Sequence, residues 1–279
     1  MQMKLKHLLS CMGLGATLVL TSCMSEDPGF DFGAETSKVY GSLNLESLTV
    51  NSEFDPLTRA VSEDAYRNVS NYNIRVVDTK SGTDVLNCAY SSLADNMPLP
   101  LEIGSYTIIA SYGAEHAFSR DEFLVTGEQT VTINANAEQN VSVSCAPTCG
   151  KLTVEFDPTM STYFDAYSVT YSGTQAMGIQ SCTWEKADTA PWYVAIGENG
   201  ENVNYKIHLT AKADYLPEGQ TSKTAEIPGT ILLKRNKAHK LTIAPNYKPS
   251  TEGGISLTIT IDESTNDKEI TWEVPVTWI

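Results

Sequence analysis

Apolar and polar residues alternate along most of the chain, beginning near Val39. Apolar residues at every second position place one face of a strand in a core and leave the other face in water. Many of these positions carry β-branched or aromatic side chains, which strands favour. The pattern predicts half-buried antiparallel strands over Tyr72–Val76, Tyr106–Tyr112, Val131–Ile133, Val141–Cys145, Leu152–Phe156, Tyr167–Tyr171, Trp192–Ile196, Val203–Leu209, Ile255–Ile261 and Ile270–Trp278.

Turn residues divide these strands into two sets. Gly, Asn, Asp and Pro separate the runs at short intervals, which is typical of β-sandwiches. A break at Pro147–Gly150 lies between the sets, and Gly41–Leu45 and Gly150–Val154 open them with similar sequences. We therefore predict an all-β chain with two tandem β-sandwich domains, over residues 39–147 and 148–279.

One short helix is predicted inside the second domain. Asp157 suits the N-cap, and Pro158 suits the first helical position. Met160, Tyr163 and Phe164 follow at i, i+3 and i+4, so they can pack as one face against a sheet. We expect one or two turns.

The first 22 residues predict a signal peptide. Lys4 and Lys6 precede the apolar run Leu8–Leu20, which is shorter than the roughly 20 residues that a membrane-spanning helix needs. The next residues, Leu20–Cys23, read LTSC and resemble the lipobox of bacterial lipoproteins. The resemblance implies cleavage before Cys23 and lipidation of this residue through a thioether, with acyl chains such as palmitate that anchor a protein firmly.

Residues 23–38 are rich in Pro, Gly and acidic side chains and predict a flexible tether. Met24–Asp27 resembles the acidic signal that sends Bacteroidetes lipoproteins to the cell surface. This resemblance implies an outer-membrane lipoprotein that faces outward. The alternative is an acidic start to the tether with no export signal, which leaves the inner or outer leaflet open.

A family resemblance is carried by Pro98–Ile108, in which an apolar–Pro–apolar run leads through Gly-x-Tyr into an alternating strand. This stretch resembles transthyretin-like sandwich domains of surface proteins. With the lipobox, the hairpin Phe123–Ile133 and the closing strand Thr271–Trp278, the chain resembles Bacteroidetes fimbrillin-like surface lipoproteins. It is more similar still to a Bacteroides lipoprotein family of unknown function. The resemblance implies a role in fimbrium structure or cell adhesion, and it does not imply catalysis.

A cleavage site is implied at Arg59 and Ala60, in a polar segment after the first predicted strand. In fimbrillins a trypsin-like protease cuts after such an Arg, and another subunit's terminal strand replaces the released strand. Here the released strand is Leu43–Val50, and the donor is Glu269–Ile279. The alternative is an uncut loop and a last strand paired within its own domain. Cleavage also severs the body from Cys23, so an anchored subunit should stay uncut.

Charge and motifs exclude several other functions. The chain has 19 Lys and Arg against 34 Asp and Glu, a net charge of −15, which argues against nucleic acid as a partner. No metal-ligand spacing, phosphate-binding loop or nucleophile motif is present in the sequence. We therefore expect no enzyme, no cofactor and no metal site.

Four cysteines remain after the signal peptide and the lipobox: Cys88, Cys145, Cys149 and Cys182. An exported protein permits disulfides, and four cysteines allow three full pairings. A short Cys145–Cys149 bridge is one of the options. Buried reduced thiols are the alternative.

The sequence supports two functions. The first is a lipid-anchored pilus subunit or adhesin that contacts other subunits or a host ligand through strand pairing or loops. The second is a glycan-binding lipoprotein of a polysaccharide-uptake system, for which Trp184, in a polar segment, is the candidate exposed stacking residue. Asp188-Thr189-Ala190 also resembles an O-glycosylation pattern of exported Bacteroidetes proteins, which implies a sugar on Thr189.

Overall fold

The structure is a computed structural model that describes residues 38–54, 63–174, 180–216, 219, 221–248, 254–263 and 266–272. The predicted signal peptide, Cys23, most of the predicted tether, and Arg59 with Ala60 lie outside the described residues. The predictions made for them therefore stay predictions.

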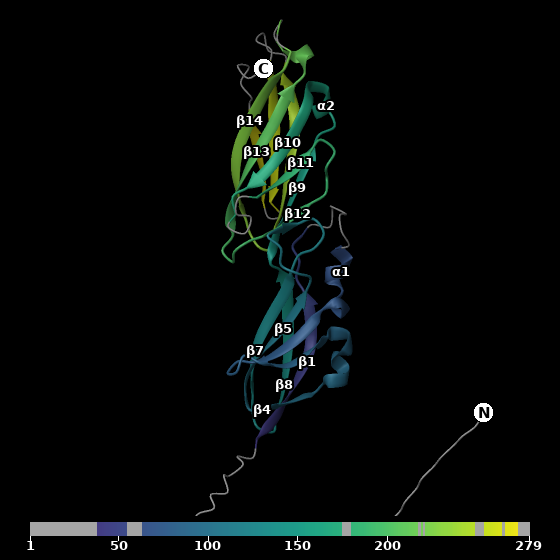
Figure 1. Ribbon diagram of the computed structural model, residues 1–279, viewed down its shortest axis with the longest axis vertical. Helices are drawn as coiled ribbons and strands as arrows, with labels where there is room; N and C mark the ends of the chain where they lie inside the picture. Colours follow the sequence, from purple (N-terminus) through teal and green to yellow (C-terminus); the bar gives the residue numbers. More distant parts are fainter. Residues whose placement is uncertain are drawn as a thin grey trace, which may run out of the picture. The chain divides into compact units, whose positions relative to one another are not determined.

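Seven strands of the N-terminal half form one sheet in the order β3-β2-β5-β7-β8-β1-β4. Figure 1 labels β1, β4, β5, β7 and β8 of this half. The strands β7 and β8 pair at Val125↔Pro147 and Thr126↔Ala146. This pairing is short, so the sheet can fold back on itself between the two strands. Its two parts enclose one core of buried side chains. The strands are β1 (Tyr40–Val50), β2 (Asn73–Asp78), β3 (Asp84–Ala89), β4 (Leu99–Glu102), β5 (Gly104–Tyr112), β7 (Val125–Ile133) and β8 (Glu138–Pro147).

The C-terminal half has two sheets around a second core. The first has the order β11-β10-β13-β14, and the second has the order β17-β16-β15-β9-β12-β6. The first sheet contains β10 (Phe164–Ser172), β11 (Ser181–Glu185), β13 (Glu201–Ala211) and β14 (Lys223–Leu233). The second contains β6 (Phe118–Ser119), β9 (Cys149–Phe156), β12 (Trp192–Ala195), β15 (Ala238–Lys248), β16 (Gly254–Glu263) and β17 (Asn266–Trp272).

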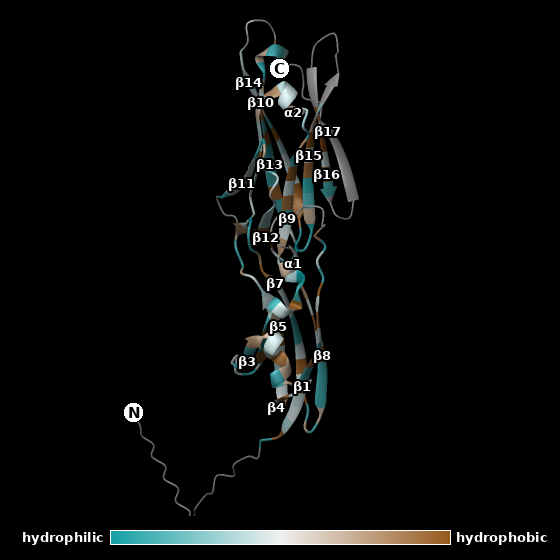
Figure 2. Ribbon diagram, turned by 90° about the vertical axis from the view of Figure 1, so that its right-hand side faces the viewer, coloured by the Kyte–Doolittle hydropathy of each residue, from teal (hydrophilic) through white to brown (hydrophobic). Residues whose placement is uncertain are grey.

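The expected all-β class is confirmed, and the alternation appears in Figure 2 as brown and teal bands along the strands. In β2 and β5 the predicted inward side chains Ile74, Val76 and Ile108 are fully buried. The expectation of antiparallel pairing is wrong at two places, since β1 pairs parallel to β8 and β9 pairs parallel to β15. These are the two strands that carry the similar sequences Gly41–Leu45 and Gly150–Val154, so both take the same place in their halves.

Helices are short among the described residues. The predicted helix is present as α2 (Met160–Tyr163), and its buried side chain is Met160. Its start differs from the prediction: Asp157 accepts a hydrogen bond from the backbone N–H of Thr159 at 2.8 Å, which places a turn before the helix. A second helix, α1 (Glu63–Arg67), was not expected, because its sequence EDAYR holds one large apolar residue, Tyr66, and gives no readable period. Short 3₁₀ segments cover Val69–Asn71, Tyr90–Asn96 and Ala213–Tyr215.

The two halves share side chains where β6 and β12 pair. The N-terminal residue Phe118 lies opposite Val194 in the six-stranded sheet, while Tyr193 packs in the N-terminal core. The strand β9 is consequently buried on both faces, and Lys151 is only 1% exposed, with its Nζ 5.9 Å from the centre of the Phe54 ring. Alternation predicts one buried face only, so it missed this burial. The predicted domain bounds stay a prediction.

Candidate functional site

The strand β1 lies inside its sheet, with a neighbour on each side. It pairs antiparallel to β4 from Tyr40 to Leu43 and parallel to β8 from Ser42 to Val50. Because β1 is paired on both sides near its start and on one side thereafter, its removal would open two hydrogen-bonding edges. This is the strand whose release the sequence implied.

The buried side chains of β1 do not keep a strict alternation. Leu43, Leu45 and Leu48 point into the core, with exposures of 0%, 9% and 7%. The register to β8 shifts between Leu45 and Ser47, so Glu46 is the extra residue of a β-bulge. The apolar spacing of the strand is therefore i, i+2, i+5. The sequence predicted the strand but not the bulge.

Polar side chains fix the same register on the outer face. Asn44 Nδ2 donates to Asn140 Oδ1 at 2.9 Å, and the hydroxyls of Ser47 and Ser142 are 2.8 Å apart. Directly after β1, Asn51 Nδ2 donates to Ser144 Oγ at 2.8 Å. A slip of one residue would break all of these pairs, because it moves each side chain to the other face.

The end of β1 is attached to the C-terminal half by a clasp, which we define as Asn51–Phe54 with Asn236 and Lys237. Asn236 Oδ1 accepts from Glu53 N at 2.9 Å, and Asn236 Nδ2 donates to Asn51 O at 3.0 Å. Lys237 also forms an ion pair with Glu53. Phe54 is 2% exposed and is packed among other aromatic rings of the N-terminal core. Strand release therefore requires the clasp to open as well.

Replacing Asn236 with Gly is expected to lower the free energy of unfolding by about 1 kcal/mol, because both hydrogen bonds of the clasp are lost. Asn236 has a φ of 57°, a left-handed conformation that Gly adopts without strain. Asn136, with a φ of 54°, provides the matched control outside the clasp. Urea unfolding should show a clearly larger effect for Asn236→Gly than for Asn136→Gly; equal effects would contradict a role for the amide contacts.

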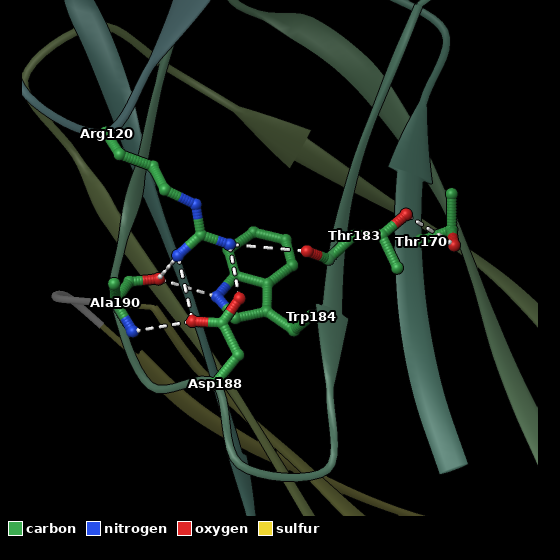
Figure 3. A network of polar contacts seen from close by, with 6 residues as sticks. All are labelled: Arg120, Thr170, Thr183, Trp184, Asp188 and Ala190. Carbon is green, nitrogen blue, oxygen red and sulfur yellow. Dashed lines mark hydrogen bonds and ion pairs between the residues drawn. The ribbon is translucent and has the colours of Figure 1, made fainter. Parts of the chain in front are cut away.

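Arg120 is the centre of a second polar network (Figure 3). Its Nη1 donates to Asp188 Oδ1 at 2.8 Å and to Ala190 O at 3.1 Å, and its Nη2 donates to Thr183 O at 3.3 Å. Its guanidinium carbon lies 4.4 Å from the ring centre of Trp192. The network joins the segment after β6 to the loop between β11 and β12, so it also links the two halves.

The expectation that Trp184 is exposed is wrong. The side chain is 0% exposed and lies in the C-terminal core, edge-on to Tyr171 at 5.5 Å between ring centres. Its Nε1 donates to Ala190 O at 2.8 Å. In β11, Cys182 and Trp184 both point inward, and two apolar positions were too few to show this phase among polar neighbours. Trp184 therefore offers no surface for a sugar ring.

Thr189 is exposed in the same loop, between Asp188 and Ala190, which both form hydrogen bonds. The carboxylate of Asp188 pairs with Arg120 and accepts from Ala190 N at 3.1 Å. The carbonyl of Ala190 accepts from Trp184. The loop thus presents the Thr189 side chain to solvent on an ordered backbone, and its glycosylation stays a prediction.

Replacing Arg120 with Met is expected to destabilise the fold by about 2–3 kcal/mol, through the lost charge-assisted hydrogen bonds and the lost contact with Trp192. Arg75 supplies the control, because it also forms two bonds to one carboxylate, at 2.8 and 3.0 Å to Asp84, but on the exposed surface. Urea unfolding of Arg75→Met should differ little from wild type. A similar effect of the two variants would argue against the network.

The four cysteines among the described residues are free thiols. Cys145, Cys149 and Cys182 are buried, and Cys88 is partly exposed. Burial raises the pKa of Cys145 to about 12, so its thiolate is scarce at neutral pH. The structure therefore agrees with the alternative of reduced thiols. Among the described residues, no group of His, Cys, Asp or Glu is suited to a metal ion.

The candidate donor segment Glu269–Ile279 is described only to Trp272. Its described part belongs to β17 and pairs with β16, where Ile270 lies opposite Ile259. This part is thus paired within its own half. In the described part of the chain, no helix is long and apolar enough to cross a membrane.

The family described as Domain of unknown function (DUF4493) matches residues 40–276, nearly all of the chain that follows the predicted tether. The chain belongs to the DUF4493 family. This agrees in part with the resemblance to a Bacteroides family of unknown function, whose lipoprotein character stays a prediction. No curated protein matches the chain.

Solved structures similar to this DUF4493 chain have low identity. A fimbrial assembly protein from Parabacteroides distasonis has 11% identity and a TM-score of 0.40, covering 84% of this chain and 98% of that one. A candidate cell adhesion protein from Bacteroides eggerthii has 12% identity and a TM-score of 0.42, covering 81% of this chain and 96% of that one. A candidate polysaccharide-binding protein from Bacteroides thetaiotaomicron has 13% identity and a TM-score of 0.42, covering 84% of this chain and 98% of that one. These TM-scores are below 0.5, so they assign no function to this chain.

Proposed function

We propose that this DUF4493 chain is a lipid-anchored surface protein, a pilus-associated subunit or adhesin, that assembles by exchange of the strand β1. The observation that carries the proposal is the place of β1: an inner strand of the sheet, held parallel to β8, that is followed by the segment with Arg59. A cut after Arg59 makes β1 a separate piece, while an uncut copy keeps its link to Cys23. The two forms would serve as polymerising and anchored subunits.

Energetics favours replacement of β1 over simple loss. Leu43, Leu45, Leu48 and Phe54 are all buried. Burial of each such side chain contributes about 1.5–3 kcal/mol, so exposing the core beneath them costs about 6–12 kcal/mol. Whole domains are stable by only about 5–15 kcal/mol. A cut subunit should therefore hold β1 until another strand takes its place.

The proposal includes action by contact and not by catalysis. Two of the buried thiols are consistent with this, because burial raises the pKa of Cys149 and of Cys182 to about 12 and keeps both protonated. The glycan-binding function loses the side chain on which it depended, since Trp184 is buried. We therefore propose one function.

The first test is strand exchange on the full chain. Trypsin-treated protein is mixed with labelled peptides of residues 40–54 and 269–279, and SDS-resistant complexes are measured. We expect the cut protein to take up at least one peptide and to release its own β1, and the uncleavable Arg59→Gln variant to do neither. A cut protein that keeps β1 and binds neither peptide would overturn the proposal.

A peptide of altered register gives a sharper test of the site. Deletion of Glu46 removes the bulge and leaves Ser47 opposite Ser142 and Leu48 opposite Val143, so this peptide is the matched control and should bind about as well as the native one. Deletion of Asn44 instead places Leu43 on the opposite face to Leu45 and should weaken binding at least about tenfold. Equal uptake of the native and the Asn44-deleted peptides would show that the leucine spacing does not set the register.

A further inference from the structure

Three exposed apolar side chains gather where the described chain begins. Val39, Tyr40 and Ile103 are 41%, 47% and 53% exposed. Tyr40 lies opposite Glu102 in the β1–β4 pair, and Ile103 N donates to Val39 O at 3.0 Å, so the three residues are direct neighbours. We call these three residues the N-terminal patch. The other large hydrophobic side chains with comparable exposure in the described part of the chain, Val85 and Leu232, lie on β3 and β14.

Polar groups lie beside the N-terminal patch. Asn136 N donates to Tyr40 O at 2.9 Å, in the loop that joins β7 to β8. Lys38 and Glu102 form an exposed ion pair beside the patch. An amphipathic Tyr next to aliphatic side chains is the composition of a surface that sits at a membrane–water interface.

The chain length before the patch decides which surface it meets. Lys38 lies 15 positions after Cys23. A flexible tether of this length has a root-mean-square span of about 20 Å. The lipid on Cys23 would therefore keep the patch close to the bilayer, at an effective concentration on the order of millimolar. At that concentration a weak apolar contact is populated.

We infer that the N-terminal patch docks on the lipid surface that holds the acylated Cys23. The inference rests on the lipid anchor of the proposed function. Docking is apolar in character, because the net charge of −15 is repelled by anionic headgroups. It should therefore persist on zwitterionic vesicles and at high salt. It concerns the uncut form, since cleavage after Arg59 detaches Cys23.

The test places a fluorescent reporter in the patch of the full acylated protein. Ile103→Trp is compared with Leu232→Trp, which changes a side chain of similar exposure on β14. Both variants are reconstituted in phosphatidylcholine vesicles with and without brominated acyl chains. The four native tryptophans give the same background in both. We expect the fluorescence added at position 103 to be quenched at least twofold by brominated lipid, and that added at position 232 to be unchanged.

The outcomes separate the inference from the proposed function. Equal quenching at the two positions, or none at either, overturns docking while labelled palmitate on Cys23 still supports the anchor. Concentration-dependent pairing through position 103 without quenching means that a second copy covers the patch, and it also overturns docking. Failure of wild type to incorporate palmitate overturns the anchor and, with it, the lipid occupant.

Discussion

Raising the pH from 8 to 12 is expected to remove most of the folding free energy of this protein. Burial raises the pKa of the Cys149 and Cys182 thiols to about 12, so the fold holds both in the neutral form. Burial also raises the pKa of Tyr72 and Tyr171. In the unfolded chain a thiol ionises near its ordinary pKa of about 8.5. Stability is therefore complete below about pH 8.5 and declines as the pH rises toward 12.

The size of this effect follows from linkage. A pKa difference of one unit corresponds to about 1.4 kcal/mol, so Cys149 and Cys182 each account for about 5 kcal/mol once the pH exceeds their folded pKa. Together they approach the total stability of about 5–15 kcal/mol that is usual for a folded domain.

Urea unfolding at half-unit steps between pH 7 and 11, followed by tryptophan fluorescence, measures this decline. The Cys182→Ala variant should show a shallower slope above pH 9 than wild type. Cys88→Ala is the control, because Cys88 is partly exposed; burial raises its pKa too, but the slope should change less than in Cys182→Ala. Stability that stays constant to pH 11 would contradict burial of the thiols.

The sequence predicted strands well where one face of a strand meets one core. Tyr72, Ile74 and Val76 alternate with polar residues, and all three are buried. The signal is local, because the alternation within each strand shows which of its faces is buried and which is exposed to water. The short helix α2 was predicted for the same reason, since its apolar spacing and its start lie within eight residues.

The failures share a tertiary cause. Lys151 is a charged residue of the kind expected on an exposed face, yet it is buried beside Phe54 and opposite Tyr193. The bulge at Glu46 depends on the hydrogen bonds of β8, about 95 positions later. Parallel pairing of β1 and β9 depends likewise on partners that no local pattern identifies.

The candidate site follows the same division. The strand Leu43–Val50 was predicted from its own residues, while its register and the clasp at Asn236 were not. Trp184 was misplaced because its contacts come from Arg120 and Ala190, and the first of these lies 64 positions away. A polar neighbour in sequence is weak evidence of exposure in a strand of five residues.

Replacing Trp184 with Ala is expected to destabilise the C-terminal half by about 3–5 kcal/mol, as is usual when a large buried aromatic side chain is truncated. The ring contact with Tyr171 and the hydrogen bond to Ala190 disappear together. For a chain of this size the melting temperature should fall by roughly 6–20 °C. Thermal unfolding followed by far-UV circular dichroism measures the change.

Trp184→Phe separates the two contributions. Phe keeps an aromatic ring beside Tyr171 and loses the indole N–H that donates to Ala190 O. This variant should lose about 1–2 kcal/mol, the cost of one buried hydrogen bond and a modest loss of volume. Comparing Trp184→Ala with Trp184→Phe also decides how a loss of sugar binding is to be interpreted. If Trp184→Ala abolishes binding while the better-folded Trp184→Phe keeps it, the loss comes from the fold; a stable Trp184→Ala protein would instead mean that the side chain lies at the surface.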